Sequence, residues 1–281
     1  MIVFPNAKVN LGLNIVSKRQ DGYHNIETVF APIPLKDTLE IIPTSRETSL
    51  HQSGSTQGIN PEDNLCMKAY CLLKNDFPEM GNVEMWLHKT IPSGAGLGGG
   101  SSDASYTLAL LNRMFELSLS NEQLRKYAIQ LGSDCPFFIE NKPLFAEGKG
   151  EEFTEINLDT TDYYWVIIKP SFSISTPEAY AGVSPQNPKN SLTEIIKLPV
   201  PEWKHRLKND FENSLFIRYP ELNTIKETLY ASGALYASLS GSGSAMFGIY
   251  RGADFSAEKI AAYFSAYTVF YEADRLIALC T

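Results

Sequence analysis

Residues 89–104 read KTIPSGAGLGGGSSDA, and glycine fills five of the seven positions from 94 to 100. In regular structure each glycine costs roughly 0.5–1 kcal/mol relative to alanine, so this density indicates a use. Without Cβ atoms, the backbone N–H groups of a loop can converge on an anion. The loop leads into a helix expected at 104–115, whose first turn offers unpaired N–H groups and about half a positive charge. The stretch therefore predicts a phosphate-binding loop.

Three other interpretations of this loop are weaker. A Walker A loop needs lysine after its second glycine, and Gly100 occupies that position. The GxGxxG pattern of dinucleotide-binding oxidoreductases is present at 94–99, but it needs a buried strand that ends in an acidic residue about 20 positions later. Glu116 stands near that distance between two expected helices, with no strand to carry it. A solvated linker without a ligand has no reason to run straight into a helix.

A second loop rich in glycine and serine reads SLSGSGSA at 238–245. It connects strands expected at 237–239 and 245–250, and by itself it is typical of an ordinary hairpin connection. Together with the first loop it becomes a candidate second wall of the same site.

Composition excludes several classes of protein. The 281 residues are 43% hydrophobic and carry a net charge of −8. A core of ordinary size is expected, whereas nucleic acid and membranes are not, because an acidic surface repels phosphate and anionic lipid. No run of 18 apolar residues occurs. The four cysteines form no CxxC pair, so a zinc site or disulfide framework is not expected, and a cytoplasmic protein is predicted.

Helices and strands alternate without regular βαβ spacing, which predicts an α+β fold. We expect an ATP-binding domain at 1–155 and a substrate-side domain at 156–281. Segments 45–60 and 184–201 are expected to be surface connections. Strands are expected at 8–15, 38–42, 83–88, 163–168, 237–239, 245–250 and 267–271, and helices at 61–77, 104–115, 121–131, 209–217, 221–231 and 256–265.

Three segments resemble the motifs of one family in order and spacing. Residues 92–102 resemble the ATP-binding motif of the GHMP kinases, which include galactokinase, homoserine kinase and mevalonate kinase. Residues 7–11 (AKVNL) resemble their first motif, and 239–243 (LSGSG) their third. The resemblance implies an N-terminal domain like domain 2 of ribosomal protein S5, a ferredoxin-like C-terminal domain, and ATP with Mg²⁺ as cofactors. It implies nucleotide binding by Pro92, Ser93, Gly94, Ala95, Gly96, Leu97, Gly98, Gly99, Gly100, Ser101 and Ser102.

Three further segments indicate which branch of the family the chain resembles: 19–24 (RQDGYH), 132–138 (GSDCPFF) and 209–212 (NDFE). They are similar to the branch of the family that phosphorylates the 2-hydroxyl of the cytidine diphosphate ester of methylerythritol, in the non-mevalonate route to isoprenoid precursors. A homoserine or mevalonate type of kinase and a catalytically inactive nucleotide sensor remain alternatives. The sequence predicts no oligomeric state.

Kinases of this kind use a lysine and an aspartate in catalysis, and the matching positions are Lys8 and Asp134. Phosphoryl transfer to a hydroxyl needs positioning, charge neutralisation and a group that accepts the hydroxyl proton. Asp134 is suited to be that base, with Lys8 holding it ionised. The alternatives are an exposed strand lysine and a turn aspartate that caps backbone N–H groups.

The resemblance also implies a pocket for the acceptor. Tyr23 and His24 match the residues that contact cytidine, and Tyr180 matches a stacking aromatic on the opposite side. Phe30 lines the same pocket or belongs to the core, and Asn10 bonds the substrate or faces solvent.

No metal ligand is assigned from the sequence. Mg²⁺ bound to ATP often keeps several waters and takes few protein ligands. Ser101, Ser102 and Asp103 stand near the expected phosphates, but Asp103 is equally suited to start the helix.

Overall fold

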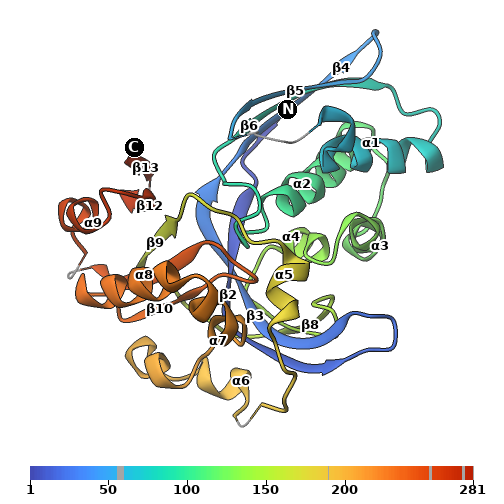
Figure 1. Ribbon diagram of the computed structural model, residues 1–281. Coiled ribbons are helices and arrows are strands. Elements are labelled where there is room, and N and C mark those ends of the chain that lie inside the picture. Colours follow the sequence, from blue (N-terminus) through green and yellow to red (C-terminus); the bar gives the residue numbers. More distant parts are fainter. Residues whose placement is uncertain (56–59, 189, 253–254, 274–275, 281) are drawn as a thin grey trace. The chain divides into compact units, whose positions relative to one another are not determined.

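The computed structural model describes residues 1–55, 60–188, 190–252, 255–273 and 276–280 (Figure 1). The chain forms two compact units, each assembled from three segments. The first unit comprises Met1–Ala7, Lys36–Ser93 and Gly98–Lys142, and the second comprises Lys8–Leu35, Gly94–Leu97 and Pro143–Thr281. The domain boundary predicted near residue 155 divides the chain into two consecutive domains, and it stays a prediction.

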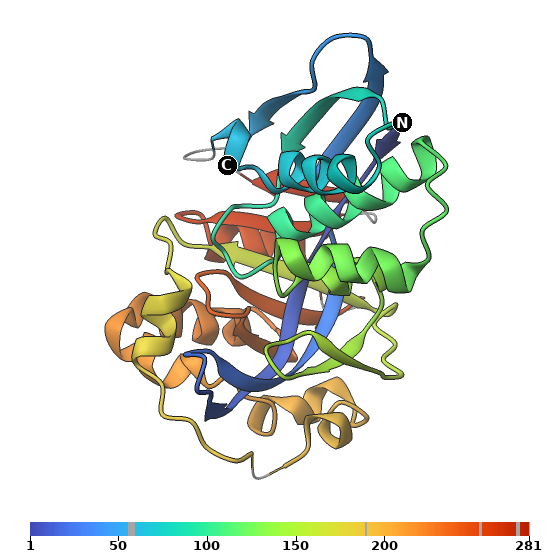
Figure 2. The ribbon, with the colours of Figure 1, turned by 90° about the vertical axis from the view of Figure 1, so that its right-hand side faces the viewer.

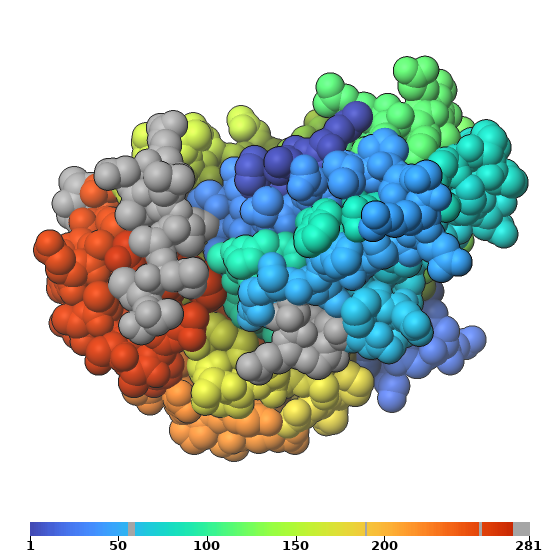
Figure 3. All heavy atoms as spheres, turned by 90° about the horizontal axis from the view of Figure 1, so that it is seen from above, coloured from blue at the N-terminus to red at the C-terminus, as the bar shows by residue number. Residues whose placement is uncertain are grey.

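The first unit is built on a four-stranded sheet. Its order is β1 (Ile2–Val3), β4 (Thr38–Thr44), β6 (Asn82–Lys89) and β5 (Ser49–Gly54). β6 pairs antiparallel with β4 and parallel with β5. Along β6 the side chains of Val83, Met85 and Leu87 are buried while Trp86 and His88 are exposed, which is the period of two that the sequence predicts. In the space-filling view of Figure 3 the blue and blue-green strands of this sheet lie at the surface.

Helices cover the other face of this sheet. They are α1 (Leu65–Asp76), α2 (Gly99–Met114), α3 (Asn121–Leu131) and α4 (Cys135–Glu140), preceded by the short turn η1 (Pro61–Asp63). Figure 2 shows α1, α2 and α3 side by side. Buried residues of α1 and α2, such as Ala69 and Leu108, join Met85 in one hydrophobic core. The capping box predicted before α3 is present, with Ser120 and Gln123 bonding each other's backbone N–H.

The second unit contains two sheets. One has the order β2 (Asn6–Lys18), β3 (His24–Lys36), β7 (Leu144–Glu147) and β8 (Glu152–Glu155). The other has the order β10 (Tyr236–Leu239), β11 (Met246–Arg251), β9 (Tyr163–Lys169), β12 (Thr268–Ala273) and β13 (Leu276–Cys280). In this five-stranded sheet the pairing is antiparallel, and Val166 on the central strand lies opposite Gly248.

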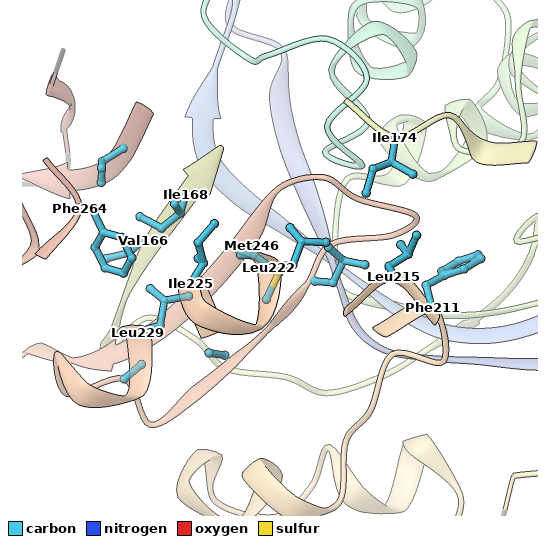
Figure 4. Packing of buried hydrophobic residues seen from close by; sticks show 14 of the residues in the cluster. Val166, Ile168, Ile174, Phe211, Leu215, Leu222, Ile225, Leu229, Met246 and Phe264 are labelled. Atoms are coloured by element: carbon cyan, nitrogen blue, oxygen red, sulfur yellow. The ribbon is translucent and has the colours of Figure 1, made fainter. Parts of the chain in front are cut away.

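Helices of the second unit lie against this sheet, against one another or against β2. They are α5 (Thr176–Ala181), α6 (Leu192–Ile195), α7 (Phe211–Arg218), α8 (Pro220–Ala231) and α9 (Ala257–Tyr263), with the turn η2 (Val200–His205). Figure 4 shows the core, where Leu222, Ile225 and Leu229 of α8 lie among side chains of β9 and β11. Leu215 and Phe211 extend this core along α7.

The predicted strands and helices are confirmed, but β1, β7, β8, β13, α4 and α5 were not predicted, and three further differences concern β3, the two expected connections and the start of α2. β3 was not predicted, because Asp21-Gly22 favours a turn and the sequence does not mark where this turn ends and a strand begins. β5 lies in the segment expected to be a surface connection, and α6 lies in the other. Within the described residues, none of the helices combines the length and apolar character needed to span a bilayer.

The third difference is that α2 begins at Gly99, not at Ala104. Helix propensity alone would exclude the two glycines at its start. Close packing outweighs propensity here, because a Cβ on Gly99 would lie 2.7 Å from Cγ2 of Ile91. The stretch predicted to bind phosphate is therefore half loop and half helix N-terminus.

Candidate active site

The phosphate loop, residues 92–102, alternates in backbone conformation. Gly94, Gly96 and Gly98 have φ angles of 63°, 76° and 70°, whereas Ala95 and Leu97 between them are buried and stay outside this left-handed region. Where left-handed residues alternate with right-handed ones, successive N–H groups turn toward one side, an arrangement suited to an anion. Gly98, in the first unit, is the N-cap of α2, and a helix N-terminus is itself suited to an anion.

In the second unit the phosphate loop is held by its neighbours. The Lys8 backbone N–H donates to the carbonyl of Leu97 at 2.9 Å. The hydroxyl of Ser240 donates to the carbonyl of Gly96 at 2.8 Å, and the Ala245 N–H donates to that of Ala95 at 3.1 Å. The glycine- and serine-rich stretch 238–245, which we call the serine loop, therefore lies directly against residues 95–97.

Lys8 and Asn10 lie on the same side of β2 and are only 3% and 2% exposed. The Lys8 ammonium donates to Oδ1 of Asn10 at 2.7 Å and lies 4.8 Å from the ring centre of Phe30. Asn10 donates in turn to the hydroxyl of Thr28 at 2.9 Å. Neither side chain faces solvent, so the surface alternatives for both residues are wrong. Phe30, 2% exposed, supports the lysine with the face of its ring.

The predicted aromatic residues gather in the second unit. The rings of His24 and Tyr180 are stacked, with centres 4.6 Å apart and planes at 16°. Partial burial, and then the charge of Lys18, lower the pKa of His24. A neutral imidazole offers one donor and one acceptor. Tyr23 is 62% exposed, and the ammonium of Lys149, which sequence reasoning missed, lies 5.1 Å from its ring centre.

Asp134 belongs to the first unit, where it occupies the N-cap position of α4. Its side chain makes no capping hydrogen bond with this helix. The preceding turn lies against the start of α2. A Cβ on Gly132 would be 3.9 Å from the hydroxyl oxygen of Ser101, and the Ser105 hydroxyl donates to the carbonyl of Cys135 at 2.7 Å. Asp134 therefore follows a turn that packs beside the end of the phosphate loop.

Three buried charges join the two ends of the phosphate loop, and sequence reasoning missed two of them, Lys89 and Asp37. The Lys89 ammonium donates to Oδ2 of Asp37 and, at 2.5 Å, to Oδ2 of Asp103. Oδ1 of Asp37 accepts the N–H groups of Thr90 at 2.6 Å and Ile91 at 2.8 Å. All three charged residues are at most 3% exposed. The cluster ties the strand that enters the loop to the helix that leaves it.

The charges in this cluster shift one another's pKa values. Burial raises the pKa of Asp103 to about 7, since it outweighs the attraction of Lys89, and the charge of Asp37 adds to the increase. Burial alone would lower the pKa of Lys89, but the attraction of Asp103 and Asp37 leaves it raised. No short sequence motif marks these residues, because the partners of Lys89 lie 52 and 14 positions away.

Replacing Lys89 by methionine is expected to destabilise the fold by about 3–5 kcal/mol at pH 8, because two carboxylates then lose their buried cation. Protonation of a carboxyl group whose pKa is raised in the folded state stabilises the fold. The loss of stability caused by the substitution therefore becomes smaller below pH 7. Urea unfolding at pH 8 and pH 5.5 measures both values. Lys126→Met is the matched control, since its ammonium pairs with Glu122 at the surface and is worth at most about 1 kcal/mol. An equal loss at both pH values would contradict this electrostatic origin.

The chemistry of the loop end fits a bound cation or anion. The hydroxyl oxygen of Ser102 and Oδ1 of Asp103 are buried without a hydrogen-bond partner in the described part of the chain. Buried polar atoms are normally satisfied, so this pair is suited to a bound ion or water. Among the described residues, no group of three or more histidine, cysteine, aspartate or glutamate side chains could hold a metal.

Comparison with known proteins identifies the family to which the chain belongs. The family model for the GHMP kinases N terminal domain matches residues 64–142, and that for the GHMP kinases C terminal matches residues 199–267. The chain belongs to the GHMP kinase family, and it is an ATP-dependent kinase of small molecules. The predicted resemblance, the α+β fold and ATP as phosphate donor are thereby confirmed.

Individual relatives are similar over most of their length. A 4-diphosphocytidyl-2-C-methyl-D-erythritol kinase of Bacteroides fragilis is 53% identical over 253 residues, which is 89% of this chain and 92% of that protein. The kinase of the same name from Bacteroides thetaiotaomicron is 54% identical, with the same coverage. A crystal structure of 4-(cytidine 5'-diphospho)-2C-methyl-D-erythritol kinase superposes with a TM-score of 0.84 at 32% identity, covering 96% of this chain and 98% of that one.

A solved mevalonate kinase has a TM-score of 0.74 at only 14% identity, with 96% of this chain and 98% of that one covered. This likeness shows the shared fold alone.

Proposed function

We propose that this kinase transfers the terminal phosphoryl group of ATP to the 2-hydroxyl of 4-diphosphocytidyl-2-C-methyl-D-erythritol, giving the 2-phosphate and ADP in isoprenoid precursor biosynthesis. The observation that carries the proposal is the high identity, over most of the chain, with relatives named for this substrate. The aromatic side chains of Tyr23, His24 and Tyr180 support it, because a pyrimidine ring stacks on such surfaces.

The phosphate loop is the proposed binding site for the nucleotide. Its N–H groups and the N-terminus of α2 hold the phosphates of ATP, and the hydroxyls of Ser101 and Ser102 add donors. Ser102 is the side chain best suited to hold Mg²⁺, because its buried oxygen has no hydrogen-bond partner in the described part of the chain. Bound Mg²⁺ neutralises charge on the phosphates.

Asp134 is the proposed general base. It takes the proton of the acceptor hydroxyl, whose oxygen then bonds to the terminal phosphorus while the bond to the bridging oxygen breaks and ADP leaves. Lys8 supplies a buried positive charge, and Asn10 fixes the position of its ammonium. Lys8 lies next to Leu97, and the turn before Asp134 lies next to Ser101, so each catalytic candidate borders the phosphate loop within its own unit.

The proposed acceptor pocket uses Tyr23, His24, Phe30 and Tyr180. Since His24 and Tyr180 are in direct contact, a pyrimidine stacks on the outer face of this pair or on Tyr23, or it parts the two rings. Lys149, close to Tyr23, adds a cation suited to the diphosphate of the acceptor. We also propose that the enzyme works in the cytoplasm, where thiols such as Cys66, Cys71 and Cys135 stay reduced.

Turnover with a panel of acceptors tests the function. The protein is incubated with Mg-ATP and, separately, the cytidine diphosphate ester of methylerythritol, homoserine or mevalonate, and ADP is measured by a coupled assay. We expect ADP only with the cytidine ester, and a new phosphomonoester at its 2-position by ³¹P NMR. Turnover with homoserine or mevalonate instead would assign another branch of the family. ATP binding without any turnover would indicate a nucleotide sensor.

A further inference from the structure

The segment Asn209-Asp210-Phe211-Glu212 stands at the start of α7, and the proposed reaction gives it no role. In the structure its four side chains contact three parts of the second unit: β2, the serine loop and α5. Asp210, for example, accepts the backbone N–H of Ile15 in β2 at 2.8 Å, and its own N–H donates to the carbonyl of Leu13 at 2.9 Å. These contacts fix the start of α7 to the strand that carries Lys8 and Asn10.

Asn209 and Glu212 hold the serine loop. Nδ2 of Asn209 donates to the carbonyls of Leu239 at 2.9 Å and Gly241 at 2.8 Å, on either side of Ser240. Glu212 accepts the N–H of Leu239 at 2.9 Å and the hydroxyl of Ser238, also at 2.9 Å. Asn209 is 1% exposed and Glu212 8% exposed, so water does not compete for these bonds.

The serine loop transmits this constraint to the phosphate loop. The Ser240 hydroxyl bonds the carbonyl of Gly96, and a Cβ on Gly96 would lie 2.0 Å from the carbonyl oxygen of Ser240. A Cβ on Gly241 would lie 3.3 Å from both the carbonyl oxygen of Gly96 and Oδ1 of Asn10. Because this packing is so close, a shift of the serine loop displaces the backbone of the phosphate loop as well.

Phe211 serves the acceptor side. Its ring packs edge-on against Tyr180, with centres 4.9 Å apart and planes at 86°, and Tyr180 stacks in turn on His24. Figure 4 shows Phe211 at the end of the core cluster, next to Leu215 of the same helix. The core therefore fixes Phe211, and Phe211 fixes the angle of the Tyr180 ring. Glu178 of α5 accepts the Tyr219 hydroxyl at 2.6 Å, which ties α5 to the end of α7.

We propose that Asn209, Phe211 and Glu212 form a positioning hub that sets the two substrate sites separately. Asn209 and Glu212 place the phosphate loop through the serine loop, and Phe211 places the aromatic stack that receives the pyrimidine. None of the three touches a substrate. The assignment of the two sites rests on the proposed function.

The test separates the Michaelis constants for the two substrates. Ser240→Ala and Asn209→Ala are expected to raise KM for ATP about three- to tenfold and leave KM for the cytidine ester within about twofold, because one or two hydrogen bonds to the loop are lost. Phe211→Leu is expected to raise KM for the cytidine ester by a similar factor and to leave KM for ATP unchanged. Phe216→Leu, on the same helix and only partly buried, is the matched control and changes neither.

Thermal unfolding of each variant identifies those that fold poorly. Ser240→Ala removes the fewest contacts, so this variant tests the effect on KM for ATP if Asn209→Ala unfolds. If KM for ATP and KM for the cytidine ester rise together in every folded variant, or neither changes, the positioning hub is wrong even when the wild-type protein phosphorylates the cytidine ester. If the wild-type protein turns over no acceptor, the proposed function fails. In that case calorimetry measures the affinity of each variant for a non-hydrolysable ATP analogue and for CDP. Equal effects of a substitution on both affinities would contradict the positioning hub.

Discussion

Replacement of Asp134 by asparagine is expected to lower turnover by a factor of about 10²–10⁴ while the affinity for ATP stays within about twofold. General bases contribute rate factors of this size, and asparagine has nearly the same shape but cannot accept a proton at neutral pH. In the proposed site the nucleotide is held by the backbone of the phosphate loop, which the substitution does not alter. Single-turnover kinetics measure the chemical step, and calorimetry with a non-hydrolysable ATP analogue measures binding.

Glu122→Gln is the matched control for this prediction. Glu122 is an exposed carboxylate on α3, in the same unit, and pairs with Lys126. We expect its turnover to equal that of the wild type. Undiminished turnover in Asp134→Asn would remove the assignment of the base, whereas loss of ATP affinity in this variant would show that Asp134 shapes the nucleotide site.

Gly96→Ala is expected to raise KM for ATP at least tenfold and to destabilise the fold by about 2–4 kcal/mol. The backbone at Gly96 has φ of 76°, which costs alanine about 1 kcal/mol, and overpacking typically costs about 1–3 kcal/mol more. The new methyl group would lie 2.0 Å from the carbonyl oxygen of Ser240, so the phosphate loop and the serine loop must separate. Steady-state kinetics and urea unfolding measure the two effects.

Gly100→Ala is the control for stability. This position lies in α2, and the nearest atom to an added Cβ is 3.8 Å away, at Leu65. Alanine is favoured over glycine inside a helix, so stability is expected to stay equal or rise slightly. If Gly96→Ala were as stable as Gly100→Ala, the close approach of the two loops would be wrong.

The phosphate loop could be predicted from the sequence because its signal is local. Five glycines before a helix predict a loop of unusual conformation that ends in a helix N-terminus, and the capping box at Ser120 marks the next helix equally well, whereas phosphate binding itself stays a prediction. The start of α2 was misplaced for a physical reason: propensity argues against Gly99, but its packing against Ile91 depends on a contact that no sequence window contains.

The supporting contacts of the site could not be predicted, because they join residues far apart in the chain. Burial of Lys8 and Asn10 depends on which face of β2 is covered, and an alternating strand pattern does not say so. The bonds from Asn209 to the serine loop span 30 and 32 positions. The stacking of His24 on Tyr180 likewise arises only when β3 and α5 fold together.

Hydrogen exchange of the backbone amides at 94–103 tests the central claim most directly. The account predicts that a non-hydrolysable ATP analogue with Mg²⁺ slows exchange in this stretch more than anywhere else in the chain, because these N–H groups bond its phosphates. Unchanged exchange at 94–103, with protection appearing in another segment at saturating analogue, would contradict it.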